Sequence, residues 1–152
     1  MNLRQRLSAL NIELPTVSGP FGAYVPARQV GNLIYVSGQL PMKDGALLAS
    51  GQVPSRCTIE QAKLAARQCV INALSVVNTL PGGLDRISGV VRVGAFVNSD
   101  PTFTQQPQVA NGASELLLEL FGDAGKHTRA AVGVNTLPLD AAVEIEFIFE
   151  AA

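Results

Sequence analysis

Residues 128–136 alternate in character from one residue to the next, which is typical of a β-strand and constrains the fold more than any other stretch of the chain. Arg129, Ala131, Gly133 and Asn135 fall on one face of this strand. Small neighbours on the same face leave space around a guanidinium. The pattern therefore predicts a strand that presents one arginine with room for a small anion.

A second alternating run follows the turn at 137–140. One of its faces is apolar and the other is acidic, so it predicts a half-buried return strand. We therefore expect a C-terminal hairpin that can place Arg129 and Glu144 on the same side of a sheet. The apolar face carries Val143, Ile145, Phe147 and Phe149, and the acidic face carries Glu144, Glu146 and Glu150.

The remaining elements follow from spacing and from capping signals. Thr58 with Gln61 forms a capping-box pattern, which predicts a helix that ends before Pro81. The order of elements predicts an α+β domain over residues 1–152, in which a mixed β-sheet has two helices packed on one face. We predict an N-terminal helical extension over 1–14, strands at 24–25, 32–38, 46–48 and 87–97, and a second long helix over 107–120.

Composition limits the classes of partner. Charged residues make up 15% of the chain against a usual value of about 25%, so some apolar surface is expected to meet a partner subunit. The net charge of -1 gives no electrostatic footprint for nucleic acid. We expect no disulfide framework from Cys57 and Cys69, no metal site, no membrane span and no signal peptide. A cytoplasmic location is the expectation.

Arg129 and Glu144 are the strongest candidates for chemistry. A guanidinium binds a carboxylate through two parallel hydrogen bonds, and a nearby glutamate can position water or carry a proton. The alternative is a structural ion pair between strands. His127 is the only histidine, and a lone histidine beside a strand start is more often a hydrogen-bonded surface residue.

Three further polar residues have both a functional and a structural interpretation. Ser37 either lines a pocket or satisfies the backbone at a strand end. Asn111 precedes Gly112 inside a helix, where both residues are poor helix formers, so its amide either has a target or marks a bend. Tyr24 is either a pocket wall with a polar tip or an edge aromatic.

The chain resembles the Rid family of reactive-intermediate imine deaminases, also called YjgF-type or L-PSP proteins. The resemblance spans roughly residues 20–150 in consistent order. It is carried by the segments Gly22–Val25, Gly31–Pro41, Arg129–Pro138 and Val143–Glu146. It implies a chorismate-mutase-like fold, assembled as a homotrimer with ligand clefts between subunits.

The resemblance also implies roles for particular residues. Arg129 occupies the position that binds the carboxylate of a 2-imino or enamine acid, and Glu144 the position linked to the attacking water. The positions that contribute to substrate binding are Tyr24, Ser37, Gly38, Asn111 and Ala131.

This chain also departs from the family pattern. The family's Pro-Ala before the arginine is His127-Thr128, its common cysteine is Ala131, and the proline before Tyr24 is Ala23. These departures and the extra N-terminal helix indicate a divergent subgroup.

The function that the resemblance implies is hydrolytic deamination of small 2-imino acids, without a cofactor. The alternatives are a non-catalytic trimer that binds small carboxylates such as keto acids, an endoribonuclease and a structural trimer. An endoribonuclease ranks low because the chain is acidic overall and has one histidine.

Overall fold

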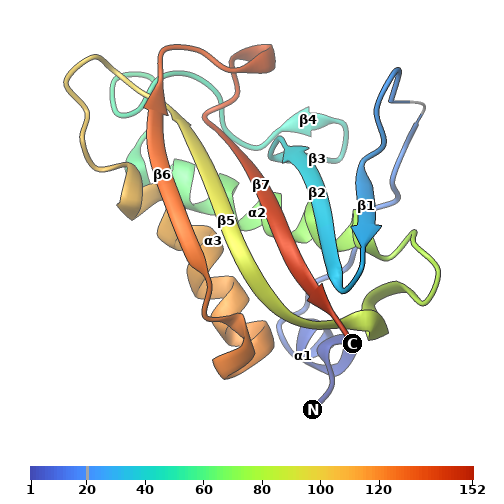
Figure 1. Cartoon of the computed structure of the whole chain (residues 1–152). Helices are drawn as coiled ribbons and strands as arrows, with labels where there is room; N and C mark the ends of the chain where they lie inside the picture. Colours follow the sequence, from blue (N-terminus) through green and yellow to red (C-terminus); the bar gives the residue numbers. More distant parts are fainter. Residues whose placement is uncertain (20) are drawn as a thin grey trace.

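The computed structural model describes residues 1–19 and 21–152. Five strands form one mixed sheet in the order β1–β2–β7–β5–β6 (Figure 1). β5 and β6 are parallel, whereas the other neighbouring pairs are antiparallel. A separate two-stranded ribbon is formed by β3 and β4. The strands are β1 (Ala27–Val30), β2 (Leu33–Gln39), β3 (Met42–Lys43), β4 (Ala46–Leu47), β5 (Ile87–Asn98), β6 (Thr128–Val134) and β7 (Val143–Ala151).

Two long helices, α2 (Ile59–Val77) and α3 (Gln106–Phe121), cover one face of the sheet, and the other face is left open (Figure 1). The short α1 (Leu3–Ala9) packs against α3. Single 3₁₀ turns are η1 (Gly83–Arg86), η2 (Gly122–Gly125) and η3 (Pro138–Asp140). The predicted α+β class, with a mixed sheet and two helices on one face, is confirmed.

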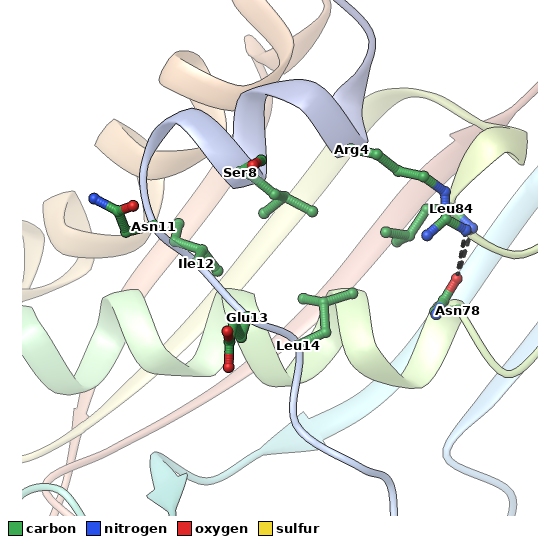
Figure 2. Close-up of a pocket in the computed structure, with 9 residues that line it drawn as sticks. Arg4, Ser8, Asn11, Ile12, Glu13, Leu14, Asn78 and Leu84 are labelled. Carbon is green, nitrogen blue, oxygen red and sulfur yellow. Dashed lines mark hydrogen bonds between the residues drawn. The ribbon is translucent and has the colours of Figure 1, made fainter.

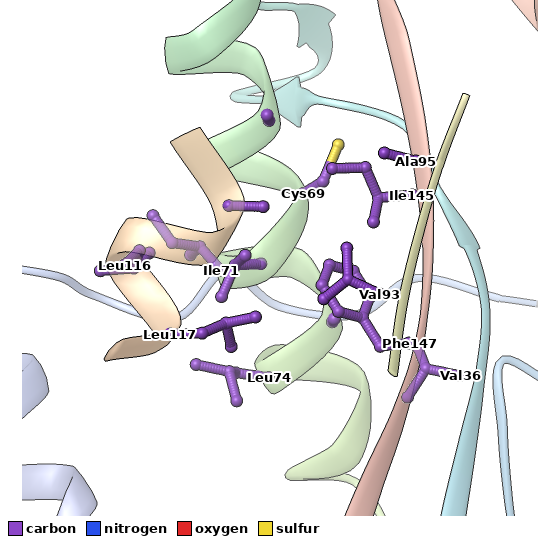
Figure 3. Packing of buried hydrophobic residues seen from close by; sticks show 14 of the residues in the cluster. Val36, Cys69, Ile71, Leu74, Val93, Ala95, Leu116, Leu117, Ile145 and Phe147 are labelled. Carbon is purple, nitrogen blue, oxygen red and sulfur yellow. The ribbon is translucent and has the colours of Figure 1, made fainter. Parts of the chain in front are cut away.

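The core lies between the two long helices and the sheet (Figure 3). The predicted apolar face of β7 is buried throughout, and Phe147 and Phe149 stack with their ring centroids 5.7 Å apart. α2 presents alanines and Cys69 to the sheet, so the helix can approach closely. Cys57 and Cys69 are both free thiols, and burial raises the pKa of each.

Thr58 caps α2 as its capping-box pattern predicts. Its side chain accepts a hydrogen bond from the backbone N–H of Gln61, and the Gln61 side chain accepts one from the N–H of Thr58. The helix ends at Val77 rather than at Leu80, because Asn78 begins a tight turn that leads to Gly82.

Gly112 explains why an Asn-Gly pair stands inside α3 without breaking it. A Cβ atom at this position would lie 2.0 Å from the carbonyl oxygen of Lys63 in α2. The glycine therefore allows the two helix backbones to approach each other, and α3 runs through it from Gln106 to Phe121.

The predicted C-terminal hairpin is wrong. β6 and β7 are not neighbours, because β5 lies between them and pairs with both. The predicted strand at Tyr24–Val25 is also displaced: the hairpin partner of β2 is β1, which begins at Ala27. Pro26, which cannot donate a backbone hydrogen bond, directly precedes that strand.

No helix in the described ranges is both long enough and apolar enough to cross a membrane.

Candidate functional site

Arg129 lies on β6 and points to the side of the sheet that the helices cover. Its register partner on β5 is Val93, which is fully buried beneath them. From this position the guanidinium reaches α3, where Nη1 donates hydrogen bonds to Oδ1 of Asn111 at 2.8 Å and to Oγ of Ser114 at 3.1 Å. Asn111 therefore has a target for its amide.

The two hydrogen bonds use both N–H groups of Nη1 and leave the opposite edge of the guanidinium, formed by Nε and Nη2, available. Within residues 1–19 and 21–152, no hydrogen bond engages that edge and no carboxylate oxygen lies within 4.0 Å of the Arg129 nitrogens. Arg129 is exposed to solvent on this edge strand. An arginine held on one side and free on the other is suited to bind a carboxylate from outside the chain.

Ala131 and Gly133 follow Arg129 along the same face of β6. Ala131 is partly buried against the core. A Cβ atom at Gly133 would meet Nε2 of Gln106 at 2.7 Å and Oγ of Ser99 at 3.0 Å, so these two side chains pack against this position.

Glu144 lies on the open face of the sheet. It is half-buried and packs over Gly38, where a Cβ atom would lie 3.0 Å from Cδ of Glu144 and 3.2 Å from Oε2. Burial raises the pKa of the Glu144 carboxyl, and the nearby charge of Glu146 raises it further. Glu146 itself pairs with Arg92 at 3.0 Å.

Ser37 and Gly38 form an irregularity in the pairing of β2 with β7, where the register shifts between Val36 and Gln39. Oγ of Ser37 donates a hydrogen bond to the carbonyl of Val25 at 2.9 Å, so it satisfies the backbone as its structural interpretation expects. This bond ties the segment that carries Tyr24 to β2. Tyr24 is 60% exposed, and its ring centroid lies 6.0 Å from that of Phe21.

The candidate residues thus form two groups in one chain. The arginine group consists of Arg129, Asn111 and Ala131 on β6 and α3. The glutamate group consists of Glu144, Gly38, Ser37 and Tyr24 on β7, β2 and the segment before β1. The expected placement of Arg129 and Glu144 on the same side of a hairpin is wrong, because they face opposite sides of the sheet and belong to strands separated by β5.

Two further residues adjoin the arginine group but were not predicted as site residues. Ser114 contacts Arg129 directly, and His127 contacts Ser114 through Nε2 at 2.8 Å. The spacing of Asn111 and Ser114 offered a signal, since residues three apart on a helix share a face. His127 precedes Arg129 by two positions, which is the spacing of side chains on the same side of a strand.

Two cavities of the described chain lie away from the candidate site residues. One, of about 420 Å³, is bounded by α1, the segment that follows it and the end of α2, and an Arg4–Asn78 hydrogen bond of 3.1 Å crosses one side (Figure 2). A wider groove of about 880 Å³ lies between residues 10–18, α2 and the β3–β4 ribbon. Neither contains Arg129 or Glu144. The described part of the chain contains no group of three or more His, Cys, Asp or Glu side chains placed to hold a metal ion.

Comparison with known proteins covers almost the whole chain. A family model described as "YjgF/chorismate mutase-like, putative endoribonuclease" matches residues 4–151. Protein TCP17 of Trypanosoma cruzi is 43% identical over 145 residues, which cover 95% of this chain and 91% of that protein. A protein of Dermatophagoides farinae named 2-iminobutanoate/2-iminopropanoate deaminase is 31% identical over 137 residues, covering 90% of this chain and 92% of that protein.

A solved structure supports the same assignment. The crystal structure of Atu1372 from Agrobacterium tumefaciens, described as a protein of unknown function, has a TM-score of 0.88 and 41% identity. The match covers 98% of this chain and 91% of that one. The family match begins at residue 4, within α1. The resemblance inferred from sequence is confirmed: the chain belongs to the YjgF family, whose members are also called Rid and L-PSP proteins.

Proposed function

We propose that this protein hydrolyses small 2-imino acids, and the enamine acids in equilibrium with them, to 2-keto acids and ammonia. The observation that supports this proposal most is the state of Arg129. One nitrogen of its guanidinium is held by Asn111 and Ser114, and its other edge has no partner among the described residues. The name of the Dermatophagoides farinae relative supports the same chemistry.

The site that we propose is shared between copies of the chain. Arg129 and Glu144 face opposite sides of one sheet, so a single ligand reaches both only if they come from different subunits. β6 is an edge strand with an exposed surface, and the face that carries Glu144 is uncovered. A homotrimer with clefts between subunits satisfies this requirement.

The chemistry needs a fixed carboxylate and a positioned water. Arg129 binds the carboxylate and so fixes the imine carbon. Glu144 holds the water that adds to that carbon, while a proton passes to the nitrogen. The resulting carbinolamine loses ammonia and leaves the keto acid. The raised pKa of Glu144 suits a carboxyl that gives and takes a proton during these steps. Tyr24 closes the cleft.

The test compares ammonia and keto-acid release from imines that an amino-acid oxidase generates in place. Arg129→Ala is expected to remove the acceleration over spontaneous hydrolysis, a loss of roughly 100-fold or more in kcat/KM, because a charged bidentate contact is lost. Lys126→Ala is the matched control, since it removes an exposed cation three positions away whose ion pair in the described part of the chain is with Asp123. Equal activity of Arg129→Ala and the wild type would contradict the proposal.

One observation favours a second candidate, a non-catalytic binder of small carboxylates. Arg129 is complete as an anion site within one chain, whereas Glu144 does not reach it there. Glu144→Gln separates the two functions. A deaminase with this substitution keeps its affinity for a keto acid and loses turnover, whereas a binder has no turnover to lose.

The description of the family model as an endoribonuclease is not supported by an equivalent observation. Both ring nitrogens of His127, the one histidine, are engaged in hydrogen bonds, and the net charge is -1. We therefore do not propose RNA cleavage.

A further inference from the structure

We propose that His127 and Ser114 are positioning residues that hold the guanidinium of Arg129 in place through an ordered chain of hydrogen bonds. The chain runs from the carbonyl of Gly125 to His127, from His127 to Ser114, and from Ser114 to Nη1 of Arg129. The consequence for ligand affinity rests on the proposed function, whereas the hydrogen-bond chain itself does not.

With a neutral imidazole, the partners of His127 define the direction of each bond in this hydrogen-bond chain. The carbonyl oxygen of Gly125 only accepts, so Nδ1 of His127, 2.6 Å away, carries the proton. In the neutral ring Nε2 is then an acceptor, and the hydroxyl of Ser114 donates to it at 2.8 Å. The lone pairs of that hydroxyl oxygen face Nη1 of Arg129 at 3.1 Å. Each donor has one acceptor, and the histidine sets the orientation of the serine.

The hydrogen-bond chain begins on closely packed backbone. Gly125 is buried, and a Cβ there would lie 2.5 Å from the carbonyl oxygen of Leu117 in α3. The carbonyl that orients His127 therefore belongs to a segment packed directly on the helix that also carries Ser114. Two elements, η2 and α3, are thus linked to β6 through one histidine.

Arg129 gains a defined orientation from this arrangement. Asn111 alone would leave the guanidinium free to turn about a single hydrogen bond. The second acceptor, Ser114, fixes the plane of the group, so the edge formed by Nε and Nη2 keeps one direction. Preorganisation of this kind lowers the entropic cost of ligand binding.

The hydrogen-bond chain depends on His127, a position at which this sequence departs from the pattern that it resembles. The residue that the resemblance implies at position 127 is proline, which has neither a side-chain donor nor an acceptor. The positioning device therefore depends on the imidazole of His127.

The single histidine allows a direct spectroscopic test, because every imidazole signal of the protein belongs to His127. Long-range ¹H–¹⁵N spectra near pH 8 are expected to show the neutral ring protonated at Nδ1 with a hydrogen-bonded Nε2. In Ser114→Ala, Nε2 loses its donor and its resonance moves toward that of a free pyridine-type nitrogen. Ser114→Thr keeps the hydroxyl and is expected to retain the wild-type signal.

Two further measurements follow the effect to Arg129. The rotation of its guanidinium about the Cζ–Nε bond, observed by ¹⁵N exchange, is expected to speed up several-fold in Ser114→Ala and in His127→Phe. The Kd for 2-oxobutanoate is expected to rise roughly five- to tenfold in Ser114→Ala and to recover in Ser114→Thr.

A ring protonated at Nε2, or an unchanged rotation rate in Ser114→Ala, would overturn the positioning role whatever the protein binds. Absence of keto-acid binding and of imine turnover in the wild type would instead count against the proposed function. The spectroscopic results would still decide the role of His127 and Ser114.

Discussion

At the scale of single residues, the ionised carboxylate of Glu144 lowers the stability of the folded chain. It is half-buried against Gly38 and beside Glu146, and both burial and that neighbouring charge raise the pKa of its carboxyl above the usual 4.5. A raised folded-state pKa means that the folded chain holds this proton more tightly than the unfolded chain. The stability contribution of Glu144 therefore falls as pH rises from the usual value through the raised one.

Glu144→Gln should accordingly increase the melting temperature at pH 7 while it lowers imine turnover. The gain should be smaller near pH 4, because the native carboxyl is then largely protonated in the folded state. Thermal melts of both proteins at the two pH values measure the difference, with Glu150→Gln as an exposed control on the same face of β7. A melting temperature that falls at pH 7, or a gain that is the same at both pH values, would contradict this assignment.

At the scale of elements, the contact between α2 and α3 depends on one missing side chain. Gly112→Ala would improve intrinsic helix propensity by about 1 kcal/mol, yet its Cβ would lie 2.0 Å from the Lys63 carbonyl oxygen. Because this neighbour is backbone, the helices must separate.

We expect Gly112→Ala to destabilise the protein by about 3 kcal/mol and to weaken ligand binding, since Asn111 and Ser114 on the same helix would shift relative to β6. Urea unfolding gives the free energy, and Glu119→Ala, on the exposed side of α3, is the control. A variant as stable as the wild type would show that α2 and α3 can separate at this contact without loss of stability.

The elements also show how far a single sequence carries prediction. Both long helices and the half-buried face of β7 followed from spacing and from the Thr58 cap, which are local signals. The partner of β7 did not, because the 137–140 turn resembles a hairpin connection while the chain instead returns past β5. The contact between Arg129 and α3 follows from the same topology. The sequence therefore predicted the residues of the candidate site but not their positions relative to one another.

At the scale of the whole molecule, the low charge content agrees with apolar residues left exposed on the open side of the sheet. Tyr35 is 46% exposed there, and Val132 on β6 is also 46% exposed. We infer that copies of the chain cover this surface, which is also where the proposed cleft between subunits would form.

Val132→Lys should therefore shift the protein toward the monomer and remove imine turnover together with assembly. Light scattering after gel filtration, at several protein concentrations, measures the mass. Leu64→Lys on the outer side of α2 is the matched control, because that leucine is 60% exposed but lies on the helix layer. A monomeric wild type, or equal effects of the two substitutions, would argue against assembly through the sheet.

β6 has a consequence for how such a protein can diversify. It is an edge strand that pairs only with β5, and its residues contribute little to the core, yet it carries the arginine that we propose meets the ligand. Substitution of the exposed Ala130 therefore has little effect on folding stability, which limits change in β5 or β7. Ligand preference can drift along this strand across generations while the fold stays the same.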